Sequence, residues 1–173
     1  PWLCHESVEG RYDFTGRLDL RAFVELAKDL GLYFIARPGP FVMAELKNEG
    51  IPHWLYDKHP HLRPLSWEGR KVESAMVIYN HPDFLAEVEK WYVRVGEILG
   101  PLLVGRGGNV MAIQLDNEIG MLQWVNNTPD LSDFTLARFN DRVSEKRGRD
   151  PYGFALEKRD ETYRLLRSPG EDF

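Results

Sequence analysis

The chain has 173 residues, of which 43% are apolar and 12% aromatic, enough core-forming material for one ordinary globular domain. Its formal net charge of -5 argues against nucleic acid as a partner, because nucleic-acid surfaces need clustered Lys and Arg, and these do not cluster here. A membrane is not an expected partner either, since no apolar stretch approaches the ~18 to 20 residues of a membrane-spanning helix.

The beginning of the chain has the pattern of an interrupted strand. Apolar residues from Pro1 run directly into His5 and Glu6, and there is no initiator methionine, so we expect a piece of a longer protein. The single thiol, Cys4, has no partner within the chain for a disulfide, which favours a reducing, cytoplasmic compartment. The sequence predicts no particular oligomeric state.

A helix and a strand are expected next. Asp19 can cap a helix over residues 20–30, where apolar side chains recur on one helical face and Gly31 supplies the stop. The apolar run 32–36 predicts a strand buried on both faces. We expect it to end at residues 37–40, because the two prolines there lack the N–H groups that a ladder requires.

The middle of the chain predicts a long functional loop over residues 41–80 with short helical turns. A second helix is expected to begin at residues 81–83, where Pro82 takes the first position and an acid suits the positive helix end. It should continue to Gly100, with one apolar face formed by Phe84, Val88, Trp91, Val95 and Ile98.

Residues 110–116 then predict a buried strand, and weaker patterns predict helices over 132–146 and 157–167. This alternation of strands and helices is typical of a parallel sheet wrapped by helices, an α/β fold. In a barrel of this kind, polar residues at the strand ends gather on one catalytic face. We therefore expect His5 with Glu6, residues 37–45 and residues 117–118 to converge.

Glu118 is the candidate catalytic residue. It follows the predicted strand 110–116, and Gly120 allows the backbone to turn sharply after it. A carboxylic acid half desolvated by apolar neighbours at a sheet rim can keep its proton and donate it to a leaving-group oxygen. The alternative is an ordinary solvated loop acid. In the catalytic interpretation, the Asn117 amide can donate to a sugar hydroxyl beside the reacting carbon.

A second candidate site residue, Glu45, follows the turn at Pro40. Its carboxylate could accept hydrogen bonds from sugar hydroxyls, with Ala44 leaving room for the ring, and the alternative is again a surface acid.

Histidines 53, 59 and 61 share one loop but lack metal-ligand spacing, so we expect neither a metal site nor a cofactor. Indole rings that could stack on a sugar are Trp2, Trp54, Trp67 and Trp124. Trp91 is expected in the core.

Several motifs occur in an order that resembles glycoside hydrolase family 35, the β-galactosidases. The similarity covers residues 1 to about 124 and is carried by Pro1-Trp2, His5-Glu6, Glu9-Gly10, Tyr12-Asp13-Phe14, Leu18-Asp19-Leu20, Arg37-Pro38-Gly39-Pro40-Phe41, Ala44-Glu45, Gly50-Ile51-Pro52, Trp54-Leu55, Gln114 and Asn117-Glu118-Ile119-Gly120. Departures from the usual family pattern stand at Leu3, Ser7, Leu46 and Ile119.

The resemblance implies a (β/α)8 TIM barrel, of which residues 1–173 would supply a fragment with about strands 2 to 4 and their helices. It implies a retaining double displacement on a galactoside or oligosaccharide substrate, with no metal or cofactor. Glu118 would be the general acid/base, and Asn117, Glu45 and Ala44 would contact the galactose. The nucleophilic carboxylate of the family lies on a later strand, so we expect the isolated chain to be inactive.

Three other interpretations are compatible with the same residues. Another barrel β-glycosidase, such as a family 42 enzyme, shares the Asn-Glu signal. A non-catalytic carbohydrate-binding protein on this fold would keep the sugar contacts without the nucleophile. A structural half-barrel that assembles with another chain would have no affinity for sugars.

Overall fold

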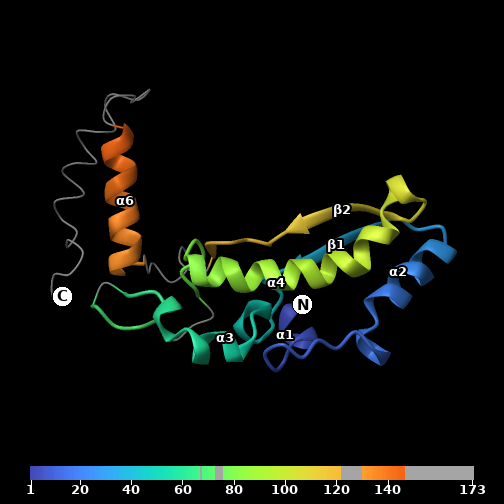
Figure 1. Ribbon diagram of the computed structural model, residues 1–173, viewed down its shortest axis with the longest axis horizontal. Helices are drawn as coiled ribbons and strands as arrows, with labels where there is room; N and C mark the ends of the chain where they lie inside the picture. The colour runs from blue at the N-terminus through green and yellow to red at the C-terminus, as the bar shows by residue number, and fades with distance from the viewer. Residues whose placement is uncertain (67, 73–75, 122–129, 147–173) are drawn as a thin grey trace.

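The computed structural model describes residues 1–66, 68–72, 76–121 and 130–146. Within these ranges, strands β1 (Phe34–Gly39) and β2 (Val110–Leu115) form a two-stranded parallel sheet, with Phe34 paired to Val110 and Gly39 to Leu115. Helix α4 (Pro82–Leu99) lies along the sheet, and its N-terminus is at the end toward which the arrow of β2 points (Figure 1). The mixed α/β character and the parallel pairing of these two segments are confirmed.

Helix α4 forms most of one side of the hydrophobic core. It begins after the N-cap His81, whose Nδ1 accepts a hydrogen bond from the Asp83 amide, and Pro82 takes the first helical position as predicted. Buried side chains recur at helical spacing along one face, and they are Phe84, Glu87, Val88, Trp91, Val95 and Leu99. The predicted stripe is therefore confirmed except at its end, where Leu99 is buried instead of Ile98.

Helix α2 (Leu20–Asp29) also forms as predicted, with the Asp19 carboxylate accepting from the Ala22 amide at 2.9 Å. Only Val24 of its apolar face is buried, whereas Phe23 and Leu30 are mostly exposed. The face that the sequence marks as apolar is thus only partly covered within the described residues.

The predicted burial of both strands is wrong. In β1 the residues alternate between buried and exposed up to Pro38, and in β2 every residue after Val110 is exposed, including Met111, Ile113 and Leu115. The reason is that the described sheet has only two strands, so each strand has a free edge and the face opposite α4 has no covering layer.

The first strand ends within the predicted range, because the last residue of β1 is Gly39. The expectation that the prolines prevent any further pairing is wrong, since the strand continues through Pro38 and Gly39 pairs with Leu115. Among the described strands, β1 pairs only with β2, and the pairing is irregular between Ala36 and Gly39. A proline on such an edge removes no ladder hydrogen bond, which is why Pro38 is tolerated there.

The first residues form a short helix, α1 (Trp2–His5), and not the strand end that the sequence suggested. Trp2 and His5 are both buried, with ring centroids 6.1 and 5.7 Å from that of Trp91. Residues three apart share a helical face but point to opposite faces of a strand, so packing both on Trp91 requires the helix.

Apart from α6, the remaining elements are short, and those within residues 41–80 are the short helical turns expected there. They are the 3₁₀ turns η1 (Gly16–Leu18), η2 (Lys47–Gly50), η3 (Pro60–Leu62), η4 (Gly100–Leu102) and η5 (Val104–Arg106), and the helices α3 (His53–Lys58) and α6 (Asp133–Lys146). The helix predicted over 157–167 lies outside the described residues. None of the helices in the described ranges has the length and apolar character needed to cross a membrane.

Asn109 ties helix α2 to the start of the sheet. Its buried Nδ2 donates to the carbonyls of Val24 (3.0 Å) and Leu32 (3.1 Å). We expect Asn109→Ala to lower the free energy of unfolding by about 1–3 kcal/mol, because a buried acceptor is left without its donor. Urea denaturation would measure this, with Asn80→Ala in an exposed turn as the control. Equal midpoints for the two variants would contradict this role of Asn109.

Candidate functional site

Two loops leave the carboxyl ends of β1 and β2 and are bonded to each other. The Phe41 amide donates to Oδ1 of Asp116 at 3.0 Å, and the Asn117 amide donates to the carbonyl of Phe41 at 3.0 Å. These bonds join residues more than seventy positions apart in sequence at one end of the sheet. The segments after the two strands were predicted to lie close together, and this is confirmed by the hydrogen bond between Phe41 and Asp116.

Two tyrosines hold this end of the sheet. The Tyr92 hydroxyl donates to the Gly39 carbonyl at 2.6 Å, and the Tyr79 hydroxyl bonds to the Asp116 carboxylate. Burial, followed by the charge of Asp116, raises the pKa of Tyr92 to about 12. Burial also raises the pKa of Tyr79, and the bond to Asp116 raises it further. Both hydroxyls therefore remain protonated donors at neutral pH.

Asp116, Tyr79 and Tyr92 were not among the residues that sequence reasoning selected. Asp116 stands directly before the Asn-Glu pair, which is a signal that could have identified it. The tyrosines carry no such signal, because their role depends on how α4 packs against the strand ends.

Glu118 projects from the loop after β2 and is exposed. With Ile119, Gly120 and Met121 it lines an open hollow of about 370 Å³. The expectation of a half-desolvated acid is wrong for the described residues, because Leu115 and Ile119 beside it are exposed and provide no apolar cover. Asn117 is half-buried, and its Oδ1 accepts from Nε2 of Gln114 at 3.0 Å.

Ala44 and Glu45 lie in the loop after β1, and both are exposed. Glu49 closes this loop by two bonds, since its Oε2 accepts from the Ala44 amide at 3.0 Å and its carbonyl from the Val42 amide at 2.9 Å. Gly50 lies against Val42, where an added Cβ would come within 2.8 Å of a methyl carbon. The loop is therefore fixed at its base and presents Glu45 to solvent.

Both candidate acids have left-handed backbone conformations that non-glycine residues rarely adopt, with φ of 53° at Glu118 and 51° at Glu45. Such conformations cost on the order of 1–3 kcal/mol each and concentrate at functional sites. The fold holds these two carboxylates in positions that local backbone preference alone would not select.

His5 and Glu6 have hydrogen bonds that fix the N-terminal segment. The Glu6 carboxylate accepts from Nε1 of Trp2 (2.5 Å) and from the Gly10 amide (2.8 Å), and His5 Nδ1 bonds to the Asp13 carbonyl (2.9 Å). Trp2 is fully buried, so its predicted sugar-stacking role is wrong.

Of the other indoles, Trp54 is half-buried and donates from Nε1 to the Glu6 carbonyl at 2.9 Å. Trp67 and Trp124 lie outside the described residues. Trp91 is in the core, as predicted, and its Nε1 donates to the Pro38 carbonyl at 3.0 Å.

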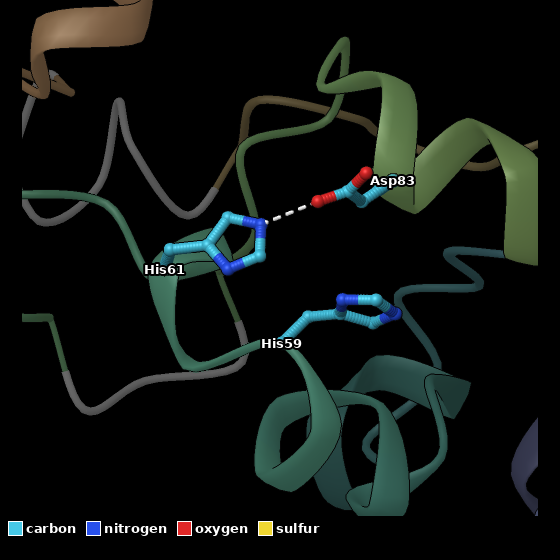
Figure 2. Close-up of side chains that lie close together, drawn as sticks. All are labelled: His59, His61 and Asp83. Carbon is cyan, nitrogen blue, oxygen red and sulfur yellow. Dashed lines mark hydrogen bonds and ion pairs between the residues drawn. The ribbon is translucent and has the colours of Figure 1, made fainter.

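One group of side chains in the described ranges offers metal-ligand atoms close together. Ligand atoms of His59, His61 and Asp83 all lie within 4.8 Å of one another (Figure 2). His53, the third histidine of that loop, bonds instead to Nδ2 of Asn48 at 2.9 Å. Sequence reasoning missed the group because Asp83 is 22 residues from His61.

Comparison with known proteins agrees with the order of motifs. The model of glycosyl hydrolases family 35 matches residues 1–148. An exo-β-D-glucosaminidase of Pyrococcus horikoshii is 42% identical over 124 residues, which cover 68% of this chain and 16% of that protein. A β-galactosidase of Bos taurus is 35% identical over 144 residues, covering 83% of this chain and 20% of the relative. A β-galactosidase of Homo sapiens is 38% identical over 120 residues, which cover 69% of this chain and 16% of that protein.

The chain thus spans about a fifth or less of the length of these relatives. The family match nevertheless extends over most of its 173 residues, and it includes both strands and the loops that carry Glu45 and Glu118. The chain therefore belongs to glycosyl hydrolase family 35.

Proposed function

We propose that residues 1–173 are part of the (β/α)8 barrel of a retaining exo-β-glycosidase that removes terminal β-D-galactosyl residues. The observation that carries the proposal is the pair of hydrogen bonds between Phe41 and residues 116–117. These bonds join the loops of Glu45 and Glu118 at the carboxyl ends of parallel strands, which is where barrel enzymes have their catalytic residues.

Glu118 is the proposed general acid/base. In the first step it would protonate the glycosidic oxygen as the bond to the anomeric carbon breaks, and in the second it would deprotonate the attacking water. The exposure of Glu118 leaves its carboxyl group accessible to a leaving group and to water. Glu45 and Ala44, on the neighbouring loop, would contact the sugar hydroxyls.

The nucleophile of a retaining enzyme is a second carboxylate ~5–5.5 Å from the acid/base. Glu6 is unsuitable, because it is buried and its two oxygens accept from Trp2 and Gly10. Glu45 does not match the family's nucleophile position. We infer that the nucleophile comes from outside this chain, so the chain alone should not turn over substrate.

The name of the Pyrococcus horikoshii relative favours a second candidate substrate, a terminal β-D-glucosaminide. The two sugars differ at carbon 4, whose hydroxyl is axial in galactose and equatorial in glucosamine, and at carbon 2, which has a hydroxyl in galactose and an ammonium in glucosamine. Oδ1 of Asn117 already accepts from Nε2 of Gln114, which leaves it one further acceptor site, whereas Nδ2 offers two donors to a ligand. A hydroxyl can accept that hydrogen bond, but an ammonium has only donors. This difference supports the galactoside.

We expect the intact protein to hydrolyse 4-nitrophenyl β-D-galactoside with a kcat/KM at least about 100-fold above that for the matching β-D-glucosaminide, because the ammonium would oppose the Asn117 donor. Steady-state kinetics with both substrates would test this. The reverse ratio would assign the glucosaminidase activity, and galactose binding without hydrolysis of either substrate would contradict a catalytic role.

A further inference from the structure

Two histidines next to helix α4 meet because of a tight turn. His59 is the C-cap of α3 and Pro60 begins η3, so that only one residue separates His59 from His61. The fully buried Leu62 anchors this turn, and its amide donates to the His59 carbonyl at 3.0 Å. The two imidazole rings are thereby fixed with centroids 5.6 Å apart and perpendicular planes.

An acid from the first turn of α4 completes the group. Oδ2 of Asp83 lies 2.7 Å from Nε2 of His61, and Figure 2 shows both side chains directed toward the gap above His59. Asp83 is held in place because its amide donates to the N-cap His81, and because the next residue, Phe84, is fully buried. Three potential ligands therefore lie on two anchored segments.

The surroundings orient these groups as in known metal sites. Nε2 of His59 is 3.4 Å from Oε1 of the buried Glu87, and the other ring nitrogen of His59 faces His61 and Asp83 in Figure 2. A histidine that ligates a metal commonly donates its second ring nitrogen to a carboxylate, which fixes the tautomer and the ring. Lys58 and Lys90 bind the same Glu87 carboxylate at 2.9 and 2.8 Å and hold it there.

We propose that His59, His61 and Asp83 form a binding site for a divalent transition-metal ion of the Zn²⁺ class. Two imidazoles and a carboxylate suit Zn²⁺, whereas Ca²⁺ and Mg²⁺ prefer oxygen ligands alone. Tetrahedral Zn²⁺, with bonds of ~2.0–2.1 Å, separates its ligand atoms by about 3.3 Å. The present separations, from 2.7 Å to at most 4.8 Å, require only small side-chain movements to reach that value.

The fourth position of the ion would hold water. The side chains of His61 and Asp83 are 49% and 46% exposed, so solvent reaches the site from one side. On binding, the hydrogen bond between these two residues is replaced by a bond from each to the ion. The imidazole binds in its neutral form, so the proton of Nε2 moves through solvent to Nδ1 of the same ring. The ion would fasten the turn after α3 to the N-terminus of α4. This site does not depend on the proposed glycosidase activity.

The experiment uses the intact protein, freed of metal by a chelator and dialysed against Zn²⁺. We expect one ion that is lost on His61→Ala or Asp83→Asn, each lowering the affinity at least about 100-fold. Glu87→Gln should weaken binding about 10–100-fold, the usual effect of removing a carboxylate that supports a histidine ligand. The matched control, His53→Ala, removes an exposed histidine of the same loop that bonds to Asn48, and should leave the affinity unchanged.

A second measurement separates the site from adventitious binding. Hydrogen exchange of residues 59–62 and 81–85 should slow about tenfold with Zn²⁺ in the parent protein but not in Asp83→Asn, whose folding the metal-free exchange pattern would verify. Binding that is unchanged by the substitutions at His61 and Asp83 would overturn the proposal. The absence of any bound ion at about 100 µM Zn²⁺ would overturn it equally.

Discussion

Replacing Glu118 by Gln in the intact protein is expected to lower kcat/KM for a galactoside with a poor leaving group by about 10²–10⁴-fold, the usual contribution of general acid–base catalysis. The amide keeps the size of the side chain but has no proton to donate to the glycosidic oxygen. A dinitrophenyl galactoside, whose leaving group needs no protonation, should lose far less in its first step. Steady-state kinetics with both substrates would measure the difference.

Azide provides an independent check, because this anion can attack the glycosyl intermediate without a general base. It should restore turnover of the dinitrophenyl substrate by Glu118→Gln and yield a galactosyl azide. The matched control is Glu89→Gln, an exposed acid in α4, which should leave both rates unchanged. A Glu118→Gln protein that retained full activity on the poor leaving group would remove Glu118 from the mechanism.

Trp91→Ala is expected to have the largest effect on stability, lowering the free energy of unfolding by about 3–5 kcal/mol. Trp91 is 1% exposed and stacks on Trp2 and Phe14, each with a centroid distance of 6.1 Å. The substitution creates a cavity among these rings and removes the hydrogen bond from Nε1 to the Pro38 carbonyl. Urea denaturation monitored by circular dichroism would measure the loss.

Two further variants separate packing from hydrogen bonding at Trp91. Trp91→Phe keeps an aromatic ring but loses the N–H donor, so its effect should fall between those of the parent protein and the alanine variant. Tyr33→Ala removes an aromatic ring that is 71% exposed and should change stability by no more than about 0.5 kcal/mol. Similar values for Trp91→Ala and Tyr33→Ala would show that Trp91 does not anchor the core.

The elements with strong local signals were predictable from the sequence. Helix α4 has a proline at its first position, an acid in its first turn and a long apolar stripe, and these features depend on the helix itself. The same holds for the Asp19 cap of α2. The loops after β1 and β2 were expected to meet because parallel strands bring their carboxyl ends to one edge.

Burial and side-chain partners were less predictable, because they depend on neighbours distant in sequence. An apolar strand such as Val110–Leu115 indicates that something should cover it, but the pattern does not state whether the cover lies within the chain. The indole of Trp2 could stack on a sugar as far as its chemistry is concerned. It lies in the core because α1 places it against Trp91. The contact of His61 with Asp83 likewise requires the turn η3 to dock at the start of α4.

The exposed apolar residues of β2 should lower the solubility of this polypeptide when it is produced alone. Within the described residues, β2 is an edge strand on which Met111, Ile113 and Leu115 are exposed, a combination that favours the addition of a strand from another molecule. Made by itself in a cell, the chain should be retained by chaperones or collect in inclusion bodies. Charged replacements at Met111 and Ile113 are the changes that should bring it into the soluble fraction.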